Sequence, residues 1–388
     1  MAKIYMKDDV FTAAQKRVSR IFDEFEHIIV GFSGGKDSTV VFNLCMAEAT
    51  KRGRLPLEVC WIDQEGEWQH TADYVKSIMY RKDVKPYWLQ FPIILFNATS
   101  HESDNWLHCW EENGEWIRDK DPISIKVNNT GTNRFHAMFP AFVRSIYPDD
   151  YDKACIVGGV RCEESPQRAR GLTSAATYKE ITWGKNENGV ISFYPIYDWS
   201  YTDVWHAIFV NKWKYNTIYD EFYKLGVPVA RMRVSNLHHE TAVKNLDYVQ
   251  EIEPKTWNKL VARLAGIHTT AEIDYDDNFK PPKTLPFMFK DWKEYRDYLL
   301  EKLIVDPEQR ETYRKQFEHD DKKTYGSEIL SDALIKCHIA SMLANDYTFT
   351  KINNFWCQHG NIYDKVKKGQ TIKGDNKFIR DIMEEVYD

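Results

Sequence analysis

The feature of this sequence that most restricts its fold is the run from Ile28 to Val41, in which an apolar strand passes through a Gly-Gly turn into a helix. Gly34 and Gly35 permit positive φ angles and close approach of a ligand to the main chain. The first turn of the helix directs unpaired N–H groups and the positive end of its dipole toward an anion. Lys36 adds a positive charge, and the serines that bound the turn add hydroxyl donors. The run therefore predicts a phosphate-binding loop.

Two common phosphate-binding motifs do not fit this run. The Walker motif needs glycine where Val30 stands and serine or threonine where Asp37 stands. The dinucleotide motif needs a third glycine that the segment 36–38 does not supply. The remaining pattern, Ser33-Gly34-Gly35-Lys36-Asp37-Ser38 behind a strand, resembles the PP-loop of the ATP pyrophosphatase superfamily. The alternative is a plain Gly-Gly turn with an incidental lysine. It is disfavoured because a Gly-Gly pair, a lysine and two flanking serines rarely coincide in such a turn.

The composition indicates a cytoplasmic enzyme. A chain of 388 residues divides into about two or three domains, and its longest apolar runs have the length of strands, too short to span a bilayer. The sequence does not open with a secretory leader, and seven cysteines without a C-x-x-C pair argue against a disulfide framework. A net charge of −6 argues against nonspecific nucleic-acid binding. We expect reduced thiols and no membrane contact.

The first part of the chain alternates helices and strands. Helices are expected over 11–25, 37–49 and 71–81, and strands over 28–32, 57–62, 86–91 and 154–159. Short apolar strands separated by helices predict an α/β fold with a doubly wound, mostly parallel sheet. Ligands of such sheets bind at the carboxyl ends of strands, where the loop 33–38 and Asp63 both fall.

The rest of the chain predicts a second, helical region. We expect a nucleotide-binding domain over 1–235, with an insertion over 97–152 that lacks a clear period and suits a lid or specificity loop. His101, His108 and Cys109 lie in this insertion without a familiar metal-site spacing. A helical domain follows over 236–388, with helices over 241–252, 254–265, 291–303, 307–319 and 327–345, a linker over 274–286 and a basic tail over 351–380. A solvated surface is the favoured interpretation of this tail, and a nucleic-acid contact is the alternative.

A second cationic segment follows the strand 154–159. That strand ends in Gly158-Gly159 and leads to Arg161, Ser165, Arg168 and Arg170. Arginine suits phosphate or sulfate because its planar fork makes paired, charge-assisted hydrogen bonds. A salt-bridged loop with the two adjacent glutamates is the alternative, and the nearby PP-loop favours anion binding.

Four motifs in one order resemble the phosphoadenosine phosphosulfate reductase family. They are the PP-loop, Asp63 after the second strand, Gly159-Val160-Arg161 with Glu164-Ser165 and Arg168, and the segment Tyr194–Trp205. The segment 216–226 continues the match, which covers about 25 to 230. The family includes the small subunit of ATP sulfurylase, and its fold is that of the adenine nucleotide α-hydrolases. The C-terminal extension over 236–388, the insertion over 97–152 and the intact PP-loop look most like the immunoglobulin-binding regulator A-type subgroup. Members of this subgroup are often encoded beside a ParB-like protein, which implies a ParB-like partner.

The resemblance implies ATP and Mg²⁺ as ligands, because ATP-splitting members keep the intact loop. It implies catalytic roles for Lys36, Asp37, Arg161 and Arg168, with Mg²⁺ held by Asp37, whose alternative role is to stabilise the first turn of its helix. It implies an adenine-nucleotide site formed by Phe32, Ser33, Gly34, Gly35, Lys36, Ser38, Ile62, Asp63, Gly159, Arg161, Ser165, Asp198 and Trp199.

The departures from the family pattern concern cysteine. Gly226 is followed by Val227-Pro228-Val229-Ala230 rather than cysteines, and the tail has no Cys-Gly-Leu-His, so we expect no iron-sulfur cluster. Cys357 is the tail thiol with a nearby histidine, and a buried inert cysteine is its favoured interpretation. The sequence therefore favours an enzyme that cleaves ATP to AMP and pyrophosphate by adenylyl transfer to an unidentified acceptor. The alternatives are a nucleotide-sensing regulatory subunit with a ParB-like or DNA-bound partner, and sulfur metabolism as a sulfonucleotide reductase or sulfate adenylyltransferase.

Overall fold

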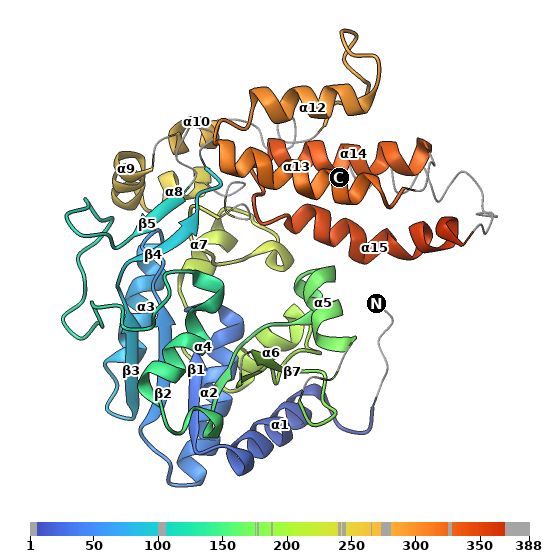
Figure 1. Ribbon diagram of the computed structural model, residues 1–388. Helices are drawn as coiled ribbons and strands as arrows, with labels where there is room; N and C mark the ends of the chain where they lie inside the picture. The colour runs from blue at the N-terminus through green and yellow to red at the C-terminus, as the bar shows by residue number, and fades with distance from the viewer. Residues whose placement is uncertain are drawn as a thin grey trace. The chain divides into compact units, whose positions relative to one another are not determined.

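The computed structural model describes residues 6–99, 106–174, 176, 178–187, 189–239, 242, 246–264, 266–272, 281–324 and 328–368. The chain forms two compact units (Figure 1). The first unit comprises Met1–Leu95, His108–Asn236 and Ile252–Thr256, and the second comprises Phe96–Leu107, Leu237–Glu251 and Trp257–Asp388.

A six-stranded sheet forms the centre of the first unit. Its strand order is β3 (Val84–Leu89), β2 (Leu57–Ile62), β1 (His27–Gly31), β6 (Ala154–Val157), β8 (Val190–Phe193) and β7 (Gly184–Glu187). Neighbouring strands from β3 to β8 are parallel, and β7 pairs with β8 in the antiparallel sense. The expected α/β fold with a mostly parallel sheet is confirmed.

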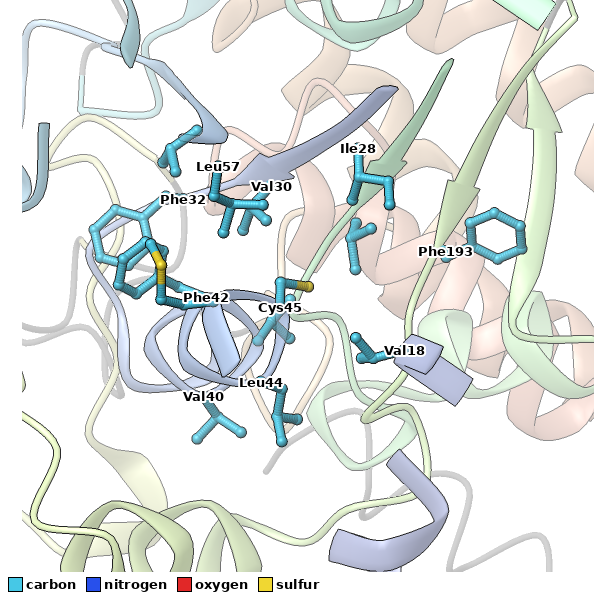
Figure 2. Close-up of a cluster of buried hydrophobic side chains, with 14 of the residues drawn as sticks. Val18, Ile28, Val30, Phe32, Val40, Phe42, Leu44, Cys45, Leu57 and Phe193 are labelled. Carbon is cyan, nitrogen blue, oxygen red and sulfur yellow. The ribbon is translucent and has the colours of Figure 1, made fainter. Parts of the chain in front are cut away.

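Helices cover both faces of this sheet. They are α1 (Val10–Glu24), α2 (Lys36–Lys51), α3 (Gln69–Met79), α4 (Phe135–Ile146), α5 (Pro166–Thr173), α6 (Tyr201–Val210) and α7 (Ile218–Lys224). Figure 2 shows Ile28 and Val30 of β1 in one core with side chains of α2 and with Val18 of α1. On the opposite face, the Phe139 ring of α4 lies 3.4 Å from where a Cβ on Gly31 would stand. Because residues two apart in a strand share a face, alternate residues of the apolar strand β1 pack against the helices on each side of the sheet.

The second unit has its own core of packed helices. Its main helices are α12 (Trp292–Lys302), α13 (Pro307–Asp321), α14 (Glu328–Leu343) and α15 (Thr350–Lys367). The Asp346 carboxylate stabilises the start of α15 by accepting hydrogen bonds from the main-chain N–H groups of Thr350 and Lys351, at 2.9 and 2.6 Å. In the sequence, the segment between α7 and α12 forms α8 (Leu246–Ile252), α9 (Pro254–Arg263) and α10 (Ile267–Glu272). Among the described residues, no helix has both the length and the apolar character needed to cross a bilayer.

The structure differs from expectation in the insertion and in the tail. The segment 97–152 contains α4, which continues through Pro140, a residue that usually disfavours a helix interior. It also contains β5 (Trp106–Cys109), which pairs with β4 (Ile93–Phe96). The first part of the expected basic tail forms α15, because apolar residues such as Ile352 and Phe355 recur at helical spacing. His101, most of the expected linker and the end of the tail lie outside the described residues.

Candidate phosphate-binding site

The loop between β1 and α2 has a backbone that only glycine permits at its centre. Gly34 has a φ of +72°, and a Cβ there would lie 2.8 Å from Cγ2 of Thr71 in α3. Asn216 donates a hydrogen bond from Nδ2 to the Gly34 carbonyl at 3.1 Å and another to Oγ1 of Thr71 at 2.9 Å. Gly35 is the N-cap of α2 and offers no side chain, so the N-cap residue itself supplies no hydroxyl or carboxylate to the first turn of α2. The loop is therefore held from outside while the start of α2 keeps its anion-binding character.

Lys36 lies buried at the first position of α2. Its Nζ donates to Oδ2 of Asp37 at 3.1 Å and to the Met232 carbonyl at 3.3 Å, and its main-chain N–H donates to the Tyr219 hydroxyl at 3.0 Å. Burial lowers the pKa of Lys36 most, and the charges of Arg161 and Arg233 lower it further, while Asp37 raises it. The ammonium group thus stands among other cations, where an anion would stabilise it.

The loop after β6 packs directly on this helix start. Arg161, which is buried, donates from Nε to Oδ1 of Asp37 and from Nη1 to Oε2 of Glu163 at 2.8 Å. A Cβ on Gly159 would lie 2.8 Å from the Asp37 carbonyl carbon and from the Ser38 nitrogen. Glycine is therefore required at 159, because the two backbones approach too closely for any side chain.

Glu164 connects three arginines of the site. Its carboxylate accepts from the Arg161 main-chain N–H at 2.9 Å and pairs with the Arg168 guanidinium, and its carbonyl accepts from Nη2 of Arg233 at 2.7 Å. Burial by surrounding atoms lowers the pKa of Arg168 and of Arg233, and each is lowered further by other arginines. Lys36, Arg161, Arg168 and Arg233 together form a cluster that we call the four-cation cluster.

The carboxylate of Asp63 has its partners within the protein. Asp63 is fully buried after β2 and accepts from Nε1 of Trp88 and Nε2 of Gln90, both at 2.9 Å, and from Arg118. Ile62, the last residue of β2, is buried and aligns with Leu89 in the neighbouring strand β3. Contacts of these two residues with a nucleotide would therefore use the main chain.

Other expected site residues have structural contacts. Asp198 pairs with Arg17 of α1, and Trp199 is buried with Nε1 donating to the Val10 carbonyl at 3.0 Å. The Trp199 carbonyl accepts from Nη1 of Arg161 at 3.2 Å and is the point where this segment reaches the cluster. The remaining three are described briefly: Phe32 packs in the core, the Ser33 hydroxyl donates to the Ser38 hydroxyl at 3.2 Å, and the Ser165 side chain caps α5.

Magnesium does not fit the arrangement around Asp37. Both carboxylate oxygens of Asp37 already accept from cations, Arg161 and Lys36, so a metal ion there would be repelled by two positive charges close to its ligand. Among the described residues, no group of three or more His, Cys, Asp or Glu side chains is arranged to hold a metal. The observed contacts of Asp37 are therefore with the two cations, Lys36 and Arg161.

A family model covers most of the first unit. Residues 27–227 match the phosphoadenosine phosphosulfate reductase domain. The chain belongs to this family. A second match, to a domain of unknown function designated DUF3440, covers residues 226–369. The family domain thus includes the PP-loop, Arg161 and Arg168, whereas Arg233 lies beyond it.

The individual proteins that are similar to this chain have low sequence identity to it. The uncharacterized protein YbdN of Escherichia coli K12 is 28% identical over 313 residues, which are 77% of this chain and 76% of that protein. FMN adenylyltransferase of Candida glabrata in complex with ATP is 14% identical with a TM-score of 0.32, over 56% of this chain and 62% of that chain. This chain thus spans less than two thirds of that enzyme. Phosphoadenylyl-sulfate reductase of Candida auris is 10% identical with a TM-score of 0.29, over 62% of this chain and 99% of that chain.

Three residues of the site received no role from the sequence. Asn216 and Tyr219 lie in a segment that the family resemblance includes, but their contacts with the loop join positions more than 180 residues apart. Arg233 lies past the end of the family domain, in the mostly apolar segment 227–234, where Arg231 stands two residues earlier and no local pattern distinguishes the two arginines.

Proposed function

We propose that the first unit binds ATP at the loop 33–38 and transfers its adenylyl group to an acceptor. The observation that supports this proposal is the start of α2, whose N-cap Gly35 has no side chain, beside the buried cations Lys36 and Arg161. A nucleophilic oxygen of the acceptor would attack the α-phosphorus, the bond from that phosphorus to the bridging oxygen would break, and pyrophosphate would leave with the electron pair.

The proposed roles follow from these contacts. The main-chain amides of the loop and Lys36 would hold the departing pyrophosphate, whose charge grows in the transition state. Arg161 would contact the α-phosphate or the acceptor, in a position set by Asp37 and Glu163. The main chain at Ile62 and Asp63 would flank the adenosine.

Product analysis tests this reaction class. ATP labelled at the α-phosphate is incubated with the protein and with separate pools of candidate acceptors, and the labelled products are resolved. We expect AMP or an adenylylated product, with pyrophosphate, and loss of both in Lys36→Ala. Lys51→Ala, an exposed lysine at the other end of α2, is the matched control and should keep the activity. ADP and phosphate as the sole products would contradict the proposal.

A regulatory subunit that senses the nucleotide is the second candidate. It is favoured by the pairing of each carboxylate of the site, Asp37, Glu163 and Glu164, with a cation, which leaves these three poorly suited to act as a general base. A ParB-like or DNA-bound partner, as in the immunoglobulin-binding regulator A-type subgroup, would read the bound state. ATP binding without products, together with partner affinity that depends on ATP, would support it. Partner binding unaffected by ATP and by Lys36→Ala would count against it.

Sulfur chemistry is the third candidate, and a thiol-dependent reductase has the weakest support. Cys162 adjoins Arg161, but burial and the charge of Asp198 raise the pKa of its thiol, which disfavours the reactive thiolate. Reduction of phosphoadenosine phosphosulfate to sulfite that Cys162→Ser or Cys357→Ser abolishes would establish this reaction. Sulfate adenylyltransferase activity would need no cysteine and is covered by the product analysis with sulfate as acceptor.

A further inference from the structure

Arg233 reaches the phosphate site from the segment that follows the family domain. This segment includes the short turn Val229–Arg231, and its Met232 carbonyl accepts from Nζ of Lys36 at 3.3 Å. One residue later, Nη2 of Arg233 donates to the Glu164 carbonyl at 2.7 Å. Two consecutive residues thus contact the two halves of the site, the start of α2 and the loop after β6.

The four cations differ in exposure and in pairing. Lys36 and Arg161 are buried and paired with Asp37, whereas Arg168 and Arg233 are partly surrounded by protein atoms and keep part of their surface exposed to solvent. Arg168 pairs with Glu164. Within the part of the chain that the structure describes, Arg233 forms no ion pair, and its hydrogen bond goes to a neutral carbonyl.

The hydrogen bond to the Glu164 carbonyl holds Arg233 close to the other cations of the site, where an anion would stabilise it. Surrounding atoms and then the charge of Arg161 lower the pKa of Arg233, while the charge of Asp37 raises it. An exposed arginine that bound no ligand could extend into solvent, where salt screens the repulsion between cations. Its donors instead lie beside Arg168 in an accessible part of the cluster, where a guanidinium can bind an oxyanion through paired hydrogen bonds.

We propose that Arg233 is an anion-binding residue that the segment after the family domain supplies to the phosphate site. Its ligand is a multiply charged oxyanion, held jointly by Arg168 and Arg233. Two sources have this chemistry, the polyphosphate tail of the nucleotide and a separate oxyanion substrate. The part of this proposal that concerns ATP rests on the proposed function.

Calorimetric titration of the full-length protein tests the proposal. Pyrophosphate, ATP, AMP and sulfate are titrated into the wild type, Arg233→Ala, Arg233→Lys and Arg231→Ala. Arg231 is exposed, lies two residues away, and makes no side-chain hydrogen bond or ion pair with the described residues, so Arg231→Ala removes the same charge without the proposed contact. Arg233→Ala should weaken pyrophosphate binding about tenfold or more, and Arg233→Lys should weaken it less. Arg231→Ala should change it by less than about twofold.

The pattern across ligands identifies the source of the oxyanion. A loss for pyrophosphate and ATP with AMP unchanged assigns Arg233 to the polyphosphate tail. A loss for sulfate with ATP unchanged assigns it to a separate oxyanion substrate. Equal affinities of Arg233→Ala and Arg231→Ala for all four ligands would overturn the proposal, provided that their thermal unfolding matches the wild type. If Arg233→Ala unfolds, Arg233→Lys and Arg233→Gln carry the same comparison.

The failure of this inference is separable from the failure of the proposed function. A wild type that binds pyrophosphate through Arg233 but does not bind ATP would refute the function and leave the anion site intact. A wild type that binds ATP with unchanged affinity for all ligands in Arg233→Ala would refute the inference alone.

Discussion

The hydroxyl of Tyr219 accepts a hydrogen bond at 3.0 Å from the main-chain N–H of Lys36, the first residue of α2. Tyr219 is buried in α7, where its ring packs edge-on against Trp205, so the acceptor has a defined place. The helix start that receives phosphate in our account is thus aligned by a side chain from the far end of the first unit's sequence.

Tyr219→Phe tests this alignment. The variant keeps the ring but leaves a buried N–H without an acceptor, which should lower the free energy of unfolding by about 1–3 kcal/mol. Saturating pyrophosphate should reduce the difference, because an anion oxygen can accept from the same N–H. Urea denaturation with and without pyrophosphate measures both values. Tyr223→Phe, at an exposed position of α7, is the control, and an identical effect of the two variants would contradict the assignment.

Gly159→Ala tests the close approach of the two loops. Its Cβ would lie 2.8 Å from main-chain atoms of Asp37 and Ser38, and backbone cannot rotate away as a side chain can. We expect a loss of about 1–3 kcal/mol in the free energy of unfolding and weaker ATP binding. Gly360→Ala is the matched change in α15, where the nearest atom lies 3.8 Å from the added Cβ. It should be neutral or stabilising by up to about 1 kcal/mol. Equal thermal unfolding of both variants would contradict the geometry.

The buried carboxyl of Glu67 should make the free energy of unfolding fall as pH rises. Burial first, and then the charge of the neighbouring Asp63, raises the pKa of the Glu67 carboxyl to about 8. Between about pH 4.5 and 8 the folded protein keeps the proton while the unfolded chain loses it, so this group's contribution to stability falls as pH rises. Glu67→Gln should match the wild type near pH 5 and be more stable at pH 8.5 by more than about 1 kcal/mol. Equal denaturation midpoints at pH 8.5 would exclude a buried protonated Glu67.

The pair of Arg17 and Asp198 tests whether Asp198 binds the nucleotide. Arg17 donates two hydrogen bonds to this carboxylate, at 2.7 and 2.6 Å. Arg17→Ala and Asp198→Ala should each lower stability by about 1 kcal/mol and show coupling in a double-mutant cycle. Their ATP affinities should stay within about twofold of the wild type. A loss of ATP affinity in Asp198→Ala that Arg17→Ala does not reproduce would place Asp198 at the nucleotide.

Local patterns predicted the parallel strands β1, β2, β3 and β6 and the loop that begins α2, but they missed the parallel strand β8. The strand 57–62 matches β2 residue for residue, and the strand expected over 28–32 lies within one residue of β1. These strands are buried and apolar, so their pattern is continuous. The turn at Gly34 also depends on adjacent residues, which is why its conformation follows from the sequence.

The unpredicted elements depend on distant parts of the chain. β7 has the sequence Gly-Lys-Asn-Glu, and its strand conformation comes from pairing with β8 rather than from its own propensity. Tyr219 and Arg233 acquire their roles from partners more than 65 residues away. The functional assignment of the individual site residues stays a prediction that the variants above examine.

Calorimetric titration of ATP into the wild type and Lys36→Ala tests the central claim most directly, because that claim is that the loop 33–38 holds the phosphates of ATP. Our account predicts binding to the wild type with one ATP per chain and an affinity at least about tenfold lower in Lys36→Ala, with Lys51→Ala unchanged. Equal ATP affinities of the wild type and Lys36→Ala, or no binding to the wild type, would contradict it.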